Sequence, residues 1–222
     1  MDETRTTLRY WASAAITMLA ACLLAPIPSA QAQMNDSFEG GPVRWRLVES
    51  DCRAELGVQE LSTIRPHNGN ASERIELKCN NGSLAYLAYP IEPTAVIDEF
   101  IPSAWTICSS GRITLGVNVI FPFAQHPVTG GRLHVILWGS TYNDTGQWQR
   151  LEVTQIAKRL DQEIIAIRNR FGAVNLNLEG AYIDALVINA YTGPGRYHLQ
   201  LDDLNLSGMI PIADLGQAVP ID

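Results

Sequence analysis

The feature that most constrains the fold is a long series of short apolar runs, each ended by Gly, Pro, Asn or Asp. The clearest example is the alternating segment 74–79, which leads through Asn-Asn-Gly-Ser at 80–83 into a second apolar run at 84–89. An Asn-Gly pair between two such runs is a strong signal for a β-hairpin. The pattern therefore predicts an antiparallel, all-β architecture. Further strands are expected at 97–100, 103–108, 113–121, 133–138, 148–153, 181–190 and 197–206.

Residues 154–171 depart from this strand pattern. Charged residues separate apolar residues that recur every three or four positions, namely Ile156, Leu160, Ile164, Ile167 and Phe171. This spacing predicts an amphipathic helix of about 17 residues, with Gly172 as its C-cap. We expect its apolar stripe to cover one end or one face of a β-sandwich.

The first 32 residues have the layout of a secretory signal peptide. Arg5 and Arg9 precede an apolar run at 11–25, which is shorter than the roughly 20 residues that a membrane span needs. Ala-Gln-Ala at 30–32 offers a cleavage site. The protein is therefore expected to be secreted, periplasmic or on the cell surface.

Two further expectations follow from this layout. Residues 19–22 (Leu-Ala-Ala-Cys) also fit a lipoprotein cleavage box, so a lipid anchor on Cys22 is the alternative to plain secretion. The folded domain is expected at 35–208, and residues 209–222 have the composition of a tail or linker.

The charge balance narrows the class of partner. The formal net charge is −7, and the basic residues form no cluster, which argues against nucleic acid or an anionic membrane surface as a partner. The sequence has no nucleophile elbow, no His-Glu-x-x-His and no phosphate-binding loop. Asp98 and Glu99 point in opposite directions on a strand, so they do not make the carboxylate pair of a glycosidase. We therefore expect a protein that is not an enzyme.

Three cysteines remain after removal of the leader, namely Cys52, Cys79 and Cys108. In an oxidising compartment the simplest arrangement is one disulfide and one spare thiol. The Cys52–Cys79 pairing is favoured because both residues lie near strand ends or loops. Cys108 lies inside an apolar strand and is expected to pack as a small buried hydrophobe.

The strand at 133–138 suggests where a ligand binds. Its side chains alternate, so His134, Ile136 and Trp138 share the more polar face, which is suited to the lining of a concave sheet. Tyr142 and Tyr191 lie near loops and join His134 and Trp138 as candidate ligand-binding residues. Aromatic faces and a few polar groups are what sugar-binding grooves use.

Four short motifs, in this order, carry a family resemblance across residues 35–208. They are Ser37-Phe38-Glu39 followed by Trp45, the His-Asn-Gly loop at 67–69 followed by a strand, Gly146-Gln147-Trp148, and Leu201-Asp202-Asp203-Leu204. In this order they resemble the galactose-binding-like jelly roll of xylanase-type carbohydrate-binding modules. The chain is also similar to the N-terminal domain of large secreted bacterial proteins in which such a sandwich precedes a glycosidase-like barrel. The helix at 154–171 and the lack of a barrel after residue 208 depart from these patterns.

The resemblance implies a jelly-roll β-sandwich with one inserted helix and a structural calcium ion at its edge. Carried over by position, the ligands are Glu39, Glu73 and one of Asp202 and Asp203, completed by carbonyls of the loop 65–70. Calcium takes 6–8 oxygen ligands of this kind. The alternative is that these acids are solvated strand ends or N-caps.

The function that the resemblance implies is non-catalytic binding of a polysaccharide or other glycan. The alternative is a scaffold or protein-interaction sandwich that is accessory to a downstream catalytic, glycosidase-like domain. A hydrolase is the least favoured of the three.

Overall fold

The structure is a computed structural model, and it describes residues 32–172 and 176–212 of the 222-residue chain. The predicted leader and tail lie largely outside these residues, so export, lipidation and the tail stay predictions. Within the described part, no helix is long and apolar enough to cross a membrane.

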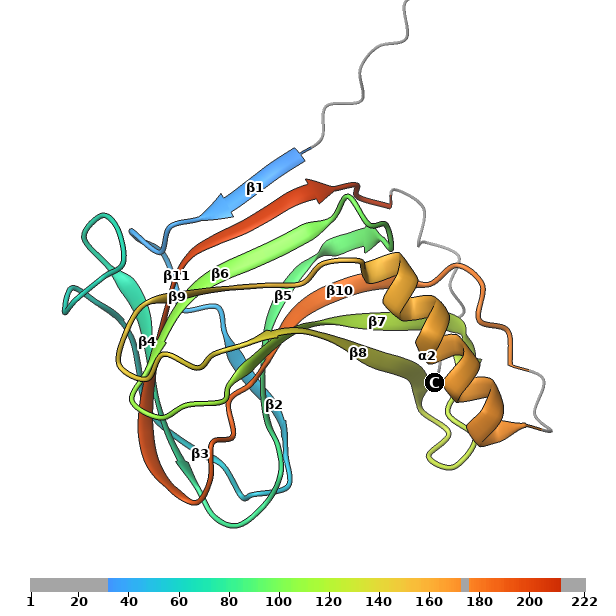
Figure 1. The fold of residues 1–222 in the computed structure, drawn as a ribbon, viewed down its shortest axis with the longest axis horizontal. Coiled ribbons are helices and arrows are strands. Elements are labelled where there is room, and N and C mark those ends of the chain that lie inside the picture. The colour runs from blue at the N-terminus through green and yellow to red at the C-terminus, as the bar shows by residue number, and fades with distance from the viewer. Residues whose placement is uncertain (1–31, 173–175, 213–222) are drawn as a thin grey trace, which may run out of the picture. The chain divides into compact units, whose positions relative to one another are not determined.

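Two antiparallel sheets form the predicted β-sandwich, and the jelly-roll fold class is confirmed (Figure 1). The first has the order β3-β4-β11-β6-β9, with β1 paired to β11. Its strands are β1 (Ala32–Asp36), β3 (Glu55–Ser62), β4 (Ser72–Cys79), β6 (Ile101–Cys108), β9 (Gln149–Glu152) and β11 (Gly195–Met209). The second has the order β2-β5-β10-β7-β8. Its strands are β2 (Arg46–Ser50), β5 (Ala85–Ala95), β7 (Thr114–Gln125), β8 (Arg132–Thr141) and β10 (Tyr182–Asn189).

The core lies between the two sheets and follows from strand alternation. In β7, Leu115, Val117 and Val119 are fully buried, while Asn118 between them points to the opposite face. Burying such side chains stabilises the fold by roughly 1.5–3 kcal/mol each. The outer face of each sheet is thus left for other contacts.

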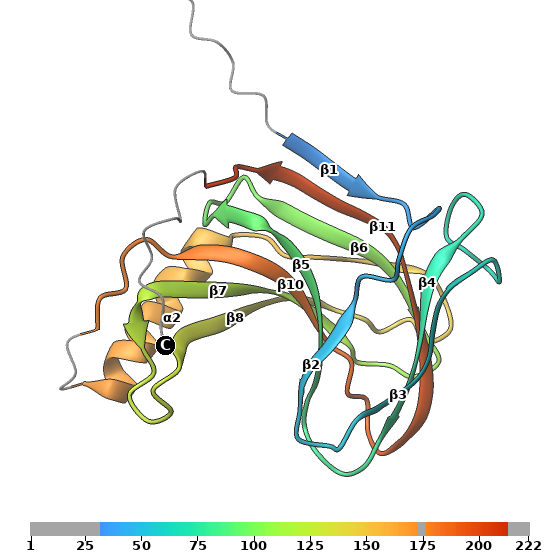
Figure 2. The same cartoon turned by 180° about the vertical axis from the view of Figure 1, so that it is seen from behind.

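The predicted helix is present as α2 (Ile156–Phe171), and it packs against β8 (Figure 2). Ile156, Leu160 and Ile167 are its buried residues. Arg159 Nη1 donates to the carbonyl of Trp138 at 2.8 Å, which ties the helix to β8. The helix therefore covers the edge of the five-stranded sheet, as its apolar stripe predicts.

The strand prediction was wrong for residues 97–100, and it did not include β1, β2 and β3. Residues 97–100 form a turn, closed by a bond from Phe100 N to Ile97 O. Strand β5 continues through Pro90 and Pro93, although proline lacks the N–H that a central ladder needs. Pro90 and Pro93 lie past the stretch where β2 pairs with β5, because that ladder covers only residues 85–88 of β5.

Candidate functional site

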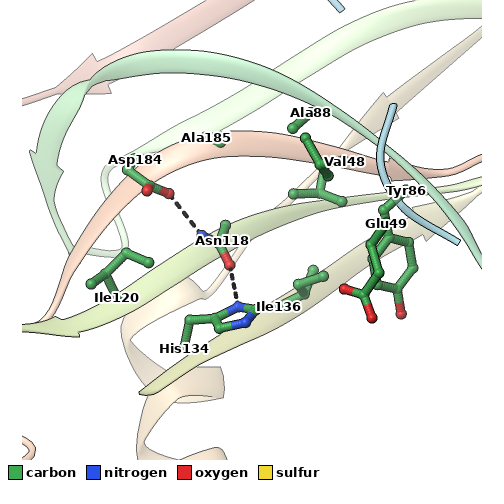
Figure 3. Close-up of a pocket in the computed structure, with 11 residues that line it drawn as sticks. Val48, Glu49, Tyr86, Ala88, Asn118, Ile120, His134, Ile136, Asp184 and Ala185 are labelled. Atoms are coloured by element: carbon green, nitrogen blue, oxygen red, sulfur yellow. Dashed lines mark hydrogen bonds between the residues drawn. The ribbon is translucent and has the colours of Figure 1, made fainter. Parts of the chain in front are cut away.

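An open groove of about 360 Å³ lies on the outer face of the five-stranded sheet (Figure 3). All five strands of that sheet contribute to it. It is lined by Val48, Glu49, Tyr86, Ala88, Asn118, Ile120, His134, Ile136, Asp184, Ala185 and Val187. The groove combines a small apolar floor with polar side chains at its ends.

A chain of hydrogen bonds crosses three neighbouring strands in this groove. Asn118 Nδ2 donates to Asp184 Oδ1 at 2.8 Å, and Asn118 Oδ1 lies 3.0 Å from His134 Nδ1 (Figure 3). Because the Asn118 oxygen is an acceptor, the His134 Nδ1 carries the proton, and the His134 Nε2 is left as an acceptor in the neutral ring. Burial raises the pKa of Asp184, and the bond from Asn118 opposes that rise.

Asp184 reaches the groove because of an irregularity in β10. The pairing of β10 with both neighbours shifts between Ile183 and Ala185, which leaves Asp184 without a partner in either ladder. Such a bulge disrupts the strict alternation of a strand. Asp184 and Ala185 therefore both line the groove, although they are neighbours in the sequence.

Two aromatic rings meet beside the groove. Tyr86 and Trp138 stand on β5 and β8, yet their ring centroids are 5.5 Å apart with planes inclined at 53°. Gly116 of β7, which lies between them, makes this possible because a Cβ there would be 2.8 Å from Trp138 Cε3. The Trp138 ring therefore lies over Gly116. Both rings are only partly buried, so they offer faces to a ligand.

The structure places the four predicted ligand-binding residues in different surroundings. His134 lines the groove, and Trp138 lies beside it. Tyr142 is fully buried, and its hydroxyl contacts the carbonyls of Cys108, Asp144 and Gln147. It holds the loop after β8 and is not accessible to a ligand, so its assignment was wrong.

Tyr191, the fourth of these residues, follows β10 and does not line the groove. Its hydroxyl accepts a hydrogen bond from Gly82 N at 3.1 Å, which ties it to the β4–β5 turn. Its contacts are therefore those of a residue that supports a turn.

Four polar or aromatic residues of the groove were not predicted as ligand-binding from the sequence, namely Glu49, Tyr86, Asn118 and Asp184. Asn118 and Asp184 each stand as a lone polar residue within an apolar strand, at Gly-Val-Asn-Val-Ile and Tyr-Ile-Asp-Ala-Leu. A polar residue in that setting has to find a partner. Their isolation among apolar residues is the sequence signal by which Asn118 and Asp184 could have been found.

The carboxylates predicted to bind calcium hold backbone amides in the structure. Glu39 accepts a hydrogen bond from Asn70 N at 2.8 Å, and Asp202 accepts one from His67 N at 2.8 Å. Both carboxylates therefore bind the backbone of the same loop. Buried Glu73 accepts from Arg44 N at 3.0 Å and from Trp45 N at 3.2 Å. Among the residues that the structure describes, no three His, Cys, Asp or Glu side chains are grouped so as to hold a metal ion. A site built from three carboxylates is thus not assembled.

Asp203, the other member of the closing pair, contacts His67 instead. His67 Nδ1 lies 2.7 Å from Asp203 Oδ2, and the ring of His67 stacks on Trp105 with a centroid distance of 3.8 Å. Trp148 meets the same ring edge-on at 5.6 Å. This cluster fastens the loop onto the outer face of the six-stranded sheet.

The predicted disulfide is not formed in the structure, in which Cys52, Cys79 and Cys108 are all free and buried. Cys52 and Cys79 are nevertheless neighbours. Burial, followed by the interaction with Cys79, raises the pKa of Cys52 to about 11. Its thiol is therefore protonated at neutral pH and a poor nucleophile. The pairing itself stays a prediction.

No protein-family model and no curated protein sequence matches this chain. Among solved structures, it is similar to the CBM22-1 xylan-binding domain of Paenibacillus barcinonensis Xyn10C. That match has 11% identity and a TM-score of 0.44, and it covers 81% of this chain and 95% of the other.

Two modules from Clostridium thermocellum match this chain about as well as the xylan-binding domain does. One is the family 11 carbohydrate-binding module in complex with a β-1,3-1,4-mixed-linked tetrasaccharide, with 14% identity, coverage of 83% and 100%, and a TM-score of 0.43. The other is the family 30 module of the cellulosomal cellulase Cel9D-Cel44B, with 11% identity, coverage of 82% and 99%, and a TM-score of 0.44. These three solved structures are carbohydrate-binding modules.

Proposed function

We propose that this protein binds a glycan chain in the groove of the five-stranded sheet and does so without catalysis. The observation that carries the proposal is the partly exposed Tyr86–Trp138 pair beside the hydrogen-bonded chain of Asp184, Asn118 and His134. Sugar rings present C–H faces that pack on aromatic rings and hydroxyls that need polar partners. The groove offers both on one surface.

The direction of the hydrogen bonds decides which ligand groups fit. Asn118 donates to Asp184, and His134 donates to Asn118, so the free positions at both ends of the chain are acceptors. Asp184 and His134 therefore suit sugar hydroxyls that donate hydrogen bonds. Ala88, Ala185 and Val187 are among the apolar residues that line the same groove.

Replacing Asn118 by alanine is expected to weaken glycan binding about tenfold, which corresponds to about 1.4 kcal/mol. The substitution removes the central member of the chain and frees both end groups. Isothermal titration with cellohexaose, xylohexaose and hexaglucosamine measures it, and Asn81→Ala in the exposed β4–β5 turn is the matched control. An absence of binding to all three by the unaltered protein would overturn the proposal and favour the scaffold alternative.

Our second proposal is a structural calcium ion at the edge of the sandwich. Its support is that Glu39 and Asp202, which come from opposite ends of the domain, hold the same loop. An ion that took oxygens from both carboxylates and from loop carbonyls would stabilise that arrangement. Glu73 is engaged with Arg44, Trp45 and Gln59, so we leave it out of this ligand set.

Calcium is expected to raise the melting temperature. At about 100 times the dissociation constant, a ligand of the native state adds about 2.7 kcal/mol. For a domain of this size that is a rise of roughly 5–11 °C. Differential scanning calorimetry in calcium and in excess chelator measures it, and Glu39→Gln should remove most of the difference. Identical melting curves under both conditions would contradict the calcium proposal and leave glycan binding unaffected.

A further inference from the structure

The charges of the groove point to a class of glycan. Two of its lining residues, Glu49 and Asp184, have carboxyl side chains, and no Lys or Arg belongs to the lining among the described residues. His134 is the remaining titratable group apart from Tyr86. An anionic sugar would therefore meet repulsion in the groove, and a cationic one would meet attraction.

One end of the groove has the features of a cation site. Glu49 lies opposite Tyr86 in the ladder between β2 and β5, and the Tyr86 ring contacts that of Trp138. Burial, with the charges of Glu49 and Asp51, raises the pKa of Tyr86. Aromatic faces attract cations through their electron-rich surface. A carboxylate opposite Tyr86, whose ring contacts that of Trp138, suits an ammonium group.

The other end carries the carboxylate of Asp184, which takes part in none of the ion pairs found among the described residues. Its side chain accepts a hydrogen bond from the neutral amide of Asn118. Burial raises its pKa, and the charges of His134 and Arg132 oppose that rise. The nearby Arg132 directs its guanidinium to the hydroxyl of Tyr182, at 3.5 Å. The carboxylate of Asp184 is partly buried, so a cationic ligand group there would meet weak competition from water.

We propose that the glycan bound in this groove carries amino groups, with glucosamine as the model sugar. This inference rests on the proposed glycan-binding function and names the ligand class of the same site. One ammonium lies at Glu49 and the Tyr86–Trp138 pair, and another reaches Asp184. The sugar rings between them pack on Ala88, Ala185 and Val187.

The test compares three β-1,4-linked hexasaccharides by isothermal titration at about pH 6, where sugar amines are largely protonated. They are hexaglucosamine, its N-acetylated form and cellohexaose, which differ at position 2 of each ring. Hexaglucosamine should bind at least about tenfold more tightly than cellohexaose at low salt. The advantage should shrink as salt rises from about 0.02 M to about 0.5 M, because salt screens charges.

Glu49→Gln and Asp184→Asn should each reduce the preference for hexaglucosamine over cellohexaose by about three- to tenfold. The matched control is Glu55→Gln, which removes one negative charge from an exposed residue paired with Lys78 on the other sheet. It should leave the preference unchanged. This control separates binding in the groove from general attraction to an acidic protein.

Each outcome has a separate meaning. Cellohexaose binding as tightly as hexaglucosamine, or an equal loss of preference in all three variants, would overturn the amino-sugar proposal while glycan binding stood. No binding of any hexasaccharide would overturn the proposed function and this inference with it. A preference that is lost in Glu49→Gln and Asp184→Asn and kept in Glu55→Gln supports the proposal.

Discussion

Replacing Trp138 by alanine should lower the affinity for a bound hexasaccharide by about thirtyfold, or about 2 kcal/mol. The ring lies over Gly116 and meets Tyr86, so its removal takes away one of the two aromatic faces beside the groove. Titration calorimetry with hexaglucosamine and cellohexaose measures the loss. A variant with unchanged affinity and an unchanged melting temperature would show that the ring has no part in binding.

Two further substitutions make this prediction specific. Gly116→Ala keeps the indole but displaces it, since the new Cβ would lie 2.8 Å from Trp138 Cε3, and it should also weaken binding. Tyr142→Phe removes a buried hydroxyl from its three carbonyl partners and should cost stability of about 1 kcal/mol with no change in affinity. Equal effects of all three substitutions on affinity would point to a general loss of structure.

Replacing Glu73 by alanine should lower the free energy of unfolding by about 3–5 kcal/mol, because three donors would lose their partner. They are the backbone N–H groups of Arg44 and Trp45 and the side-chain amide of Gln59. The melting temperature should then fall by roughly 6–20 °C. Glu55→Ala, at an exposed ion pair, should change stability by less than about 1 kcal/mol. A melting temperature for Glu73→Ala equal to that of Glu55→Ala would contradict this role.

Glu73 also makes the free energy of unfolding depend on pH, and the direction of that dependence follows from its pKa. Burial raises the pKa of Glu73 above its ordinary value, so the folded state binds the proton more tightly than the unfolded state. The contribution of this group to stability is therefore full below the unfolded pKa of about 4.5, and it is lost as pH rises through the folded pKa. Glu73→Ala should remove this part of the pH profile. Asp184 and Asp202, whose pKa values burial also raises, contribute with the same sign.

Local patterns were enough to predict the fold class and the helix. Alternation placed His134 and Trp138 on one face of β8, and the three- to four-residue spacing found α2 almost to its ends. The site itself depends on which strands lie side by side. Tyr86 and Trp138 stand on strands separated by β10 and β7, and their meeting rests on the missing side chain of Gly116. No spacing along the chain contains that information.

Loop residues were the hardest to place for a related reason. The sequence predicts Tyr142 as a ligand-binding aromatic because it lies near a loop, but its side chain is buried and its hydroxyl contacts carbonyls of its own loop. The sequence predicts Glu39 and Asp202 as ligands of one cation, and in the structure each also accepts hydrogen bonds from N–H groups of the loop 67–71. Carboxylates suit backbone amides as well as metal ions, and the sequence pattern does not separate the two.

The most direct test of the central claim follows the tryptophan indole N–H signals by NMR during titration with hexaglucosamine and with cellohexaose. If the groove of the five-stranded sheet is the binding site, the indole signal of Trp138 and the side-chain amide of Asn118 should shift and saturate together. The indole signals of Trp105 and Trp148, which pack with His67 on the six-stranded sheet, should stay in place. Shifts at Trp105 and Trp148 with Trp138 unchanged would place the site on the other sheet and contradict this account.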